Sequence, residues 1–205
     1  FYPVKHMTTG DGGMFVTRHK DVAERISKAR AFGVDRSFAE RTIPGMYDVV
    51  SLGLNYRMSD INAALGRKQL ARIGDILSRR KANFEQLKTA IEAIPGISII
   101  DSQRETSSSS HYCLSVVLEG VIKGARNEVI ARLNQAGVGT SVYYPQPVPR
   151  MTYYRNKYGY HADEFINAAA ISDQSIALPV GPHLAPGDID YVADSFRQTI
   201  KEISQ

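Results

Sequence analysis

The clearest pattern of hydrophobic positions in the chain runs from residue 67 to residue 94. Hydrophobic residues recur there at steps of three, four or seven, at Leu70, Ile73, Leu77, Phe84, Leu87, Ile91 and Ile94. This spacing places them on one face of a helix and predicts a single long amphipathic helix that ends before Pro95. The basic residues between Arg67 and Lys81 then lie on the opposite, solvent-exposed face.

The first 66 residues contain shorter and less regular patterns. They predict a strand over 12–17, a helix over 21–33, an irregular stretch over 34–54 and a helix that begins after Ser59. The first of these helices has Val22, Ile26 and Ala29 on one face, and Gly33 is its expected C-cap. Ser59 is a residue type that favours the N-cap position.

Residues 97–205 alternate between short apolar runs and helical patterns. The apolar runs predict strands over 97–100, 112–118, 138–144 and 175–180. The helical patterns predict helices over 125–137 and 186–203, and a serine-rich loop is expected over 101–111. We therefore expect an α/β chain with two parts. Residues 1–96 form the end of a larger domain together with the long helix, and residues 97–205 form a small α/β domain.

The composition is that of an ordinary folded protein and argues against several kinds of partner. Hydrophobic residues make up 43% and charged residues 22% of the 205 residues. No apolar run approaches the roughly 20 residues needed to cross a bilayer, so no membrane association is expected. The net charge is only +4, and the basic stretch at 67–81 lacks the pattern of a nucleic-acid-binding motif. We therefore expect no nucleic-acid partner.

The cysteine and histidine content bears on disulfides, cellular compartment and metal binding. The single cysteine, Cys113, allows no internal disulfide and fits a reducing compartment such as the cytoplasm. The five histidines are His6, His19, His111, His161 and His183. They show no paired spacing of the kind that metal ligands have, so no metal site is expected.

The stretch FYPVKHMTTGDGG, residues 1–13, raises a chemical question about Lys5. Most isolated lysines are solvated surface charges, and this interpretation of Lys5 stays open. A lysine amine can instead condense with a carbonyl group, which requires a fixed backbone position. Because an aromatic run precedes Lys5 and a glycine turn follows it, we expect Lys5 at a strand end with its amine in a cleft. A third interpretation is a nucleotide-binding P-loop, but this stretch lacks the Gly-Lys-Ser/Thr ending of that motif.

A second motif, LGLNYRMSDINAALG at residues 52–66, changes this assessment of Lys5. Together the two stretches resemble the DegT/StrS-type nucleotide-sugar aminotransferases, in which an Asn-Tyr-Arg-Met segment follows the catalytic lysine. The separation from Lys5 to Asn55 is 50 residues, which suits that family. Weaker matches to the same family are VYYPQPVP at 142–149 and LPVGPHLAPGDIDYV at 178–192.

The resemblance implies a fold and a cofactor. Members of the family are pyridoxal-phosphate enzymes with the aspartate-aminotransferase-like fold, also called fold type I. The chain resembles only the C-terminal part of such an enzyme, with the end of the large domain, a long connecting helix and a small α/β domain. In the family, the residues that bind the pyridine nitrogen, the ring and most of the phosphate precede the lysine. We therefore expect this chain to be inactive by itself.

The resemblance also implies roles for five residues. Lys5 corresponds to the lysine that holds pyridoxal 5′-phosphate as a Schiff base, and Asn55 to an asparagine that reaches the cofactor phosphate of the other subunit. Arg57 corresponds to an arginine near the substrate. Tyr143 and Tyr144 lie in the loop that lines the sugar pocket, with Tyr143 where the family more often has histidine. Without the resemblance, the simplest interpretation of Asn55 is a turn residue and that of Arg57 is a solvated surface charge. The two tyrosines would then pack at a strand edge.

The implied activity is the transfer of an amino group from an amino donor, glutamate by resemblance, to a nucleotide-linked keto sugar. The enzyme is then a homodimer with shared active sites. Two alternatives stay open. One is a sugar dehydratase of the same family, although the dehydratase branch replaces the lysine by histidine, and Lys5 is present here. The other is a non-catalytic dimerisation or interaction fragment.

Overall fold

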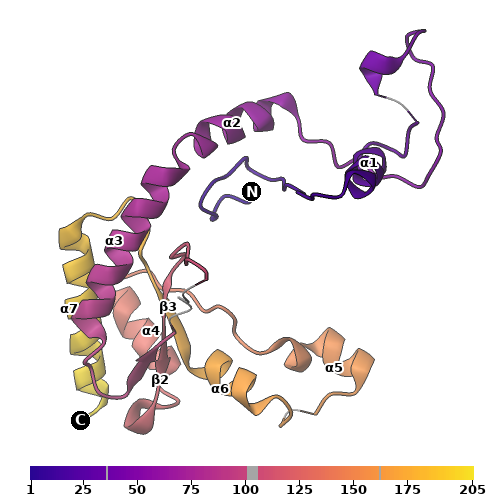
Figure 1. Ribbon diagram of the computed structural model, residues 1–205. Coiled ribbons are helices and arrows are strands. Elements are labelled where there is room, and N and C mark those ends of the chain that lie inside the picture. The colour runs from indigo at the N-terminus through magenta and orange to yellow at the C-terminus, as the bar shows by residue number, and fades with distance from the viewer. Residues whose placement is uncertain (36, 101–105, 162) are drawn as a thin grey trace. The chain divides into compact units, whose positions relative to one another are not determined.

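The computed structural model describes residues 1–35, 37–100, 106–161 and 163–205 (Figure 1). Within these ranges the chain forms two compact units, an N-terminal unit over Phe1–Ile73 and a C-terminal unit over Gly74–Gln205. The long-helix region 73–91 therefore contributes mainly to the C-terminal unit. Our assignment of residues 1–96 to a larger cofactor-binding domain stays a prediction.

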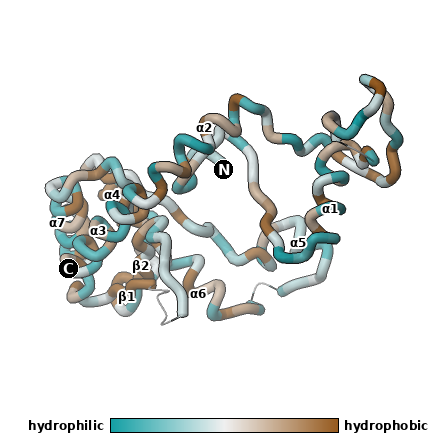
Figure 2. The backbone as a smooth tube through the Cα atoms, turned by 45° about the horizontal axis from the view of Figure 1, so that its top comes forward, coloured by the Kyte–Doolittle hydropathy of each residue, from teal (hydrophilic) through white to brown (hydrophobic). Residues whose placement is uncertain are grey.

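A small antiparallel sheet forms the centre of the C-terminal unit. Its strands are β1 (Ile97–Ile99), β2 (Leu114–Leu118) and β3 (Ser175–Leu178), in the order β1-β2-β3. Ile97 pairs with Leu118, and Leu114 pairs with Leu178. Hydrophobic residues dominate β1 and β2, as the brown tube in Figure 2 shows. The strands expected over 97–100, 112–118 and 175–180 are thus confirmed.

Three helices pack with this sheet around one hydrophobic core. They are α3 (Ile73–Ile91), α4 (Arg126–Gln135) and α7 (Pro186–Ile203). The largest side chains of the core are fully buried: Phe196, Leu87, Ile91, Leu114, Leu118, Ile122, Leu133, Ile176, Leu178 and Ile189. The expected helices over 125–137 and 186–203 are confirmed. Within the described ranges, no helix is long and apolar enough to cross a membrane.

Polar contacts join α7 to its two neighbouring helices. The Arg197 guanidinium donates to the Ala90 carbonyl at 3.0 Å, and the Tyr191 hydroxyl donates to the Ala136 carbonyl at 2.7 Å. Gln86 of α3 donates to the Asp190 carboxylate at 2.7 Å. These bonds fix the helices at their exposed edges, while the buried side chains hold their inner faces.

Other parts of the C-terminal unit differ from the sequence prediction. Residues 138–144 form no strand, because only Ser141 pairs with β3, through two hydrogen bonds to Ala177. The helices α5 (Thr152–Tyr158) and α6 (Ile166–Gln174) were not predicted. Part of the expected loop over 101–111, residues 101–105, lies outside the described residues.

The N-terminal unit contains the helices α1 (Lys20–Ala29) and α2 (Asp60–Leu70) and the short 3-10 helix Phe38–Glu40. Ser59 caps α2 as expected, since its hydroxyl accepts a hydrogen bond from the Asn62 amide at 3.2 Å. Gly33 lies beyond the cap residue of α1, but its amide donates to the Lys28 carbonyl at 2.9 Å and its φ is +71°. It therefore still closes the helix end.

Two predictions for the N-terminal half are wrong. Residues 12–17 form no strand, because in the described chain no ladder of backbone hydrogen bonds joins them to another segment; Gly12 alone accepts one, from the Phe1 amino group at 2.7 Å. The single helix expected over 67–94 is interrupted between Leu70 and Ile73. There the Arg72 amide bonds the Gln69 carbonyl three residues back, and Gly74 then gives the next helix a weak first turn.

Candidate active site

Lys5 lies in a turn at the start of the N-terminal unit. Its amide donates to the Tyr2 carbonyl at 3.0 Å, and the Thr9 amide donates to the Phe1 carbonyl at 3.0 Å. The expected strand end is therefore wrong for the described chain, and Lys5 is exposed. The turn nevertheless gives the lysine a fixed backbone position, because both of its ends are hydrogen-bonded.

The turn after Lys5 is held by its own side chains. The Thr8 hydroxyl donates to the Phe1 carbonyl at 2.9 Å and accepts from the Gly10 amide at 2.9 Å. Gly10 and Gly12 have φ angles of +83° and +130°, which side chains other than glycine's rarely allow. Thr9 is only 2% exposed. The Thr-Gly-Asp-Gly-Gly sequence thus specifies one turn geometry.

The structure brings the two sequence motifs of the N-terminal unit into contact. A Cβ built on Gly66 lies 2.9 Å from the methyl group of Thr9, so α2 approaches the turn where only glycine fits. A Cβ built on Gly12 lies 2.8 Å from the Met58 terminal methyl group. Residues 9–12 therefore pack against the middle of the second motif, at Met58, and against its end, at Gly66.

Asn55 and Arg57 lie on a segment that is bonded to the end of α1. The amides of Leu54 and Tyr56 donate to the carbonyls of Ala29 and Arg30, at 2.7 and 2.8 Å. These bonds satisfy carbonyls that a helix C-terminus leaves unpaired. They also fix the backbone on both sides of Asn55.

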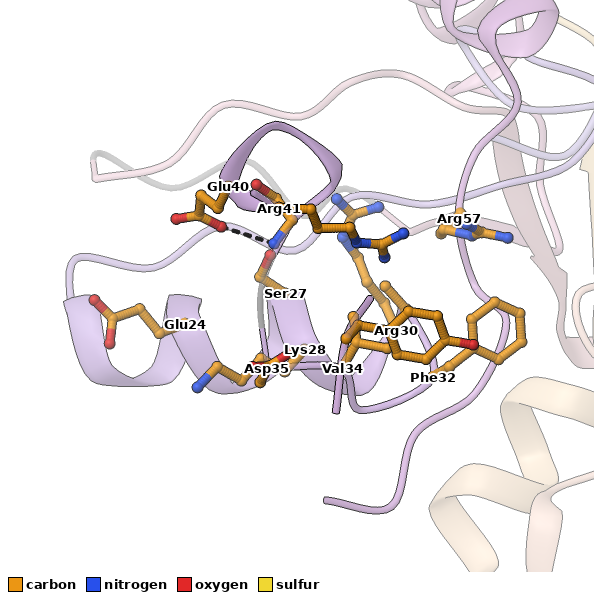
Figure 3. Close-up of a pocket in the computed structure, with 13 residues that line it drawn as sticks. Glu24, Ser27, Lys28, Arg30, Phe32, Val34, Asp35, Glu40, Arg41 and Arg57 are labelled. Atoms are coloured by element: carbon orange, nitrogen blue, oxygen red, sulfur yellow. Dashed lines mark hydrogen bonds between the residues drawn. The ribbon is translucent and has the colours of Figure 1, made fainter. Parts of the chain in front are cut away.

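The side chains of Asn55 and Arg57 contact each other. The Arg57 Nε donates to the Asn55 Oδ1 at 3.3 Å, and the Arg57 guanidinium lies 4.8 Å from the centre of the Phe32 ring (Figure 3). Asn55 is exposed. Because its oxygen faces Arg57, its NH2 group is available to donate to an anion.

A cavity of about 650 Å³ connects these features within the N-terminal unit. It is lined by the Asp11–Gly13 part of the turn, by Phe15 and Ile26, and by Tyr56, Arg57 and Met58. Neither Lys5 nor Asn55 is among the residues that line it. The chemical groups of the two contacting motifs fit pyridoxal phosphate. They are the amine of Lys5, the amide of Asn55 and the guanidinium of Arg57.

Tyr143 and Tyr144 belong to the C-terminal unit, where they lie in an aromatic group with Tyr112. The rings of Tyr112 and Tyr143 are 5.6 Å apart, and those of Tyr143 and Tyr144 are 5.7 Å apart. A side-chain hydrogen bond with Tyr143, with burial second, raises the pKa of Tyr112 to about 12. Tyr144 is 66% exposed and can therefore contact a ligand.

Sequence reasoning missed Arg80, which supports this aromatic group. Its guanidinium donates to the Tyr112 carbonyl at 2.8 Å and lies 5.8 Å from the centre of the Tyr112 ring. Burial lowers the pKa of Arg80. We expected it on the solvent-exposed face of the long helix, and no sequence motif distinguishes it from Arg79 beside it.

The family model of the DegT/DnrJ/EryC1/StrS aminotransferases matches residues 1–197. A spore coat polysaccharide biosynthesis protein, SpsC of Bacillus subtilis, is 30% identical over 98% of this chain and 52% of its own. The dTDP-3-amino-3,4,6-trideoxy-alpha-D-glucose transaminase of Streptomyces venezuelae is 27% identical over all of this chain and 50% of its own. The dTDP-4-dehydro-2,6-dideoxy-D-glucose 3-dehydratase of Saccharopolyspora spinosa is 24% identical over all of this chain and 48% of its own.

Solved structures agree with this result. Spr1654 of Streptococcus pneumoniae, named as a sugar aminotransferase and solved in its PMP form, has a TM-score of 0.87 and 26% identity. The match covers 99% of this chain and 52% of that one, and the PLP form of the same protein gives a TM-score of 0.85. The chain thus spans about half the length of the proteins that it matches.

These matches confirm two predictions. The fold is that of the C-terminal part of a fold type I pyridoxal-phosphate enzyme. Pyridoxal 5′-phosphate is the cofactor of the family and of its structural neighbours. The family model covers nearly the whole chain, and the chain therefore belongs to the DegT/DnrJ/EryC1/StrS aminotransferase family.

Proposed function

We propose that the complete protein transfers an amino group from an amino donor, glutamate in the first instance, to a nucleotide-linked keto sugar. The observation that carries the proposal is the contact between the Lys5 turn and the Asn55 motif through Thr9, Gly66 and Met58. Two motifs far apart in the sequence are thereby joined in one unit. An isolated surface lysine has no need of such a supporting arrangement.

Each candidate residue has a chemical role in this proposal. Lys5 holds the cofactor covalently at rest and afterwards moves the proton that the reaction releases. The NH2 group of Asn55 donates a hydrogen bond to the cofactor phosphate, and Arg57 carries a positive charge next to it. Pyridoxal phosphate, when bound, accepts the amino group and withdraws electrons from the bond that breaks. Tyr143 and Tyr144 contact the sugar.

The proposal includes an assembly and a location. We propose a homodimer in which Asn55 of one subunit serves the site of the other subunit's lysine, because Asn55 is exposed and its donor group is available. We also propose that the protein works in the cytoplasm. Its single cysteine, Cys113, suits a reducing compartment.

The proposal is tested with the complete protein, purified with pyridoxal phosphate. We expect a visible absorption band that hydroxylamine removes and that glutamate removes on its own, with release of 2-oxoglutarate. A keto sugar nucleotide should then restore the band and gain an amino group, measured by mass spectrometry. Loss of water from the sugar without nitrogen gain would identify a dehydratase instead. A protein with no band would be a non-catalytic interaction module.

A further inference from the structure

A second cavity of the N-terminal unit, of about 750 Å³, lies beside the candidate site. Arg57 lines both this cavity and the one next to the Lys5 turn, so the two share a wall. The second cavity is also lined by Lys28 and Arg30 from the end of α1 and by Arg41 and Tyr47 from the irregular stretch that follows. We refer to it as the arginine cavity.

The charges of the arginine cavity are separated in space. Figure 3 shows the guanidinium groups of Arg30, Arg41 and Arg57 on one side, whereas Glu24 and Glu40 lie on the other. In the described part of the chain, neither Arg30 nor Arg57 forms an ion pair with a carboxylate. The arginine side of the cavity is therefore suited to an anion with several negative charges.

The three carboxylates of the cavity have partners in the chain. Glu24 pairs with Lys20 at 3.8 Å, and Glu40 accepts a hydrogen bond from the Ser37 amide at 2.7 Å. Asp35 accepts from the Asp48 amide at 3.0 Å. These contacts hold the carboxylates at their own positions on the cavity wall.

Two aromatic rings accompany the arginines. The Arg41 guanidinium lies 4.7 Å from the centre of the Tyr47 ring, and the Arg57 guanidinium lies 4.8 Å from the centre of the Phe32 ring. Phe32 is 45% exposed and Tyr47 is 53% exposed. Each arginine is thus held over a ring that still offers apolar surface to a ligand. Guanidinium groups and aromatic rings together suit a phosphorylated compound that carries a planar base.

We propose that the arginine cavity binds the nucleoside diphosphate part of the sugar substrate. Arg30 and Arg41 contact the diphosphate, and Tyr47 contacts the base. This inference rests on the proposed function, because it names the part of that substrate which the cavity recognises. Arg57 then links the diphosphate to the sugar, since it also lines the neighbouring cavity.

The test measures binding of UDP and dTDP to the complete protein by calorimetry. Arg30→Ala and Arg41→Ala should each lower the affinity for whichever nucleotide binds more tightly by about tenfold or more, because each removes a charged hydrogen-bond donor. The matched control is Arg25→Ala, which removes an exposed arginine of α1 that does not line the cavity. It should change the affinity by less than twofold.

Two further measurements separate the parts of the proposal. Tyr47→Leu should weaken binding of the nucleoside diphosphate and leave the affinity for inorganic pyrophosphate unchanged; equal losses for both would overturn the contact with the base. For the unaltered protein, nucleotide affinity should fall as salt is added, because charges carry the binding. An affinity independent of salt would overturn the proposal even if the arginine variants do not fold.

The binding data for the two arginine variants can also contradict the proposal directly. Folded Arg30→Ala and Arg41→Ala proteins that bind both nucleotides as tightly as the unaltered protein would overturn the proposed cavity. Failure of the proposed function looks different, because the unaltered protein would then not lose its visible band with glutamate. That half of the reaction involves no nucleotide.

Discussion

The two units of the chain are stabilised in different ways. The C-terminal unit has a continuous core in which helices α3, α4 and α7 bury fully apolar side chains against the sheet. In the described part of the N-terminal unit, the buried residues are Thr9, Gly33 and Gly66, and no hydrophobic side chain is fully buried before Ile76. That unit is held by backbone hydrogen bonds and by close approaches at glycine.

The proposed site residues are distributed unequally between the two units. Motif residues Lys5, Asn55 and Arg57 all lie in the unit without a hydrophobic core. The turn geometry and the bonds to the end of α1 fix their backbone positions, while their side chains stay exposed. In the C-terminal unit, Tyr143 and Tyr144 lie in a loop whose Ser141 pairs with β3 of the hydrophobic core. Changes in the first unit should therefore affect activity, and changes in the second should affect stability.

The largest expected effect is on activity, at Lys5. Lys5→Ala in the complete protein should lower turnover by several powers of ten, because it removes both the covalent anchor and the proton carrier. Since Lys5 is exposed, the melting temperature should not change. Steady-state rates with glutamate and a keto sugar nucleotide measure this. Lys68→Ala, at another exposed lysine of the same unit, is the control, and an active Lys5→Ala protein would exclude the mechanism.

The next largest effect is on stability. It is seen by making the same substitution, isoleucine to alanine, in each of the two units. Ile189 of α7 is 0% exposed, and Ile26 of α1 is 38% exposed. In the 205-residue chain, Ile189→Ala should lower the free energy of unfolding by about 2–5 kcal/mol, because it leaves a cavity in the core. Ile26→Ala should cost less than about 1 kcal/mol. Urea denaturation followed by circular dichroism measures both, and equal costs would contradict the contrast between the units.

The accuracy of the sequence prediction also differs between elements. Helix α7 was predicted with its observed bounds, because Pro186 marks its start and its apolar stripe faces a core within the same unit. The strands expected over 12–17 and 138–144 are absent, since an extended segment becomes a strand only when another segment pairs with it. Helix α6 was missed because its sequence, INAAAISDQ, has no amphipathic stripe.

The sequence motifs named the candidate site residues, whose roles stay predictions, but did not indicate their surroundings. The two motifs identified Lys5 and Asn55 from sequence, and the structure adds their contact through Thr9, Gly66 and Met58. Arg80 and the arginine cavity could not be predicted. Their roles depend on which carbonyls, rings and charges meet when distant segments fold together, and the basic residues involved resemble other surface arginines in sequence.

A third prediction concerns Asn55 and the shared site. Asn55→Ala should raise the dissociation constant of pyridoxal phosphate about tenfold or more, because a hydrogen bond to a charged group is worth about 1.5–3 kcal/mol. Equilibrium dialysis of the complete protein measures this constant. The control is Asn134→Ala, at an exposed asparagine of the C-terminal unit, which should leave it unchanged.

Mixing variants tests whether the site is shared between subunits. An Asn55→Ala protein and a Lys5→Ala protein are combined and allowed to exchange subunits. In the mixed dimer, the intact Asn55 of one subunit meets the intact Lys5 of the other, so one complete site forms and activity should return. If the mixture stays inactive after exchange is verified, each site is built within a single subunit.

The smallest expected effect is on the titration of Tyr112 in the C-terminal unit. The hydrogen bond with Tyr143 is the main cause of a Tyr112 pKa of about 12, and Tyr143→Phe removes it. The pKa should then move down towards the ordinary tyrosine value of about 10. Because the folded protein holds this proton more tightly than the unfolded chain, the resulting stabilisation is complete below pH 10 and is lost as the pH rises through 12.

Ring resonances of Tyr112, followed by NMR during an alkaline titration, measure this shift. Tyr144→Phe is the matched control, because it removes the hydroxyl next to Tyr143 and leaves the bond to Tyr112 in place. We expect the Tyr112 titration to stay unchanged in that variant. In Tyr143→Phe, the free energy of unfolding should be lower below pH 10 and should fall less steeply above it. A Tyr112 titration that does not respond to Tyr143→Phe would show that burial, rather than the hydrogen bond with Tyr143, raises the pKa of Tyr112.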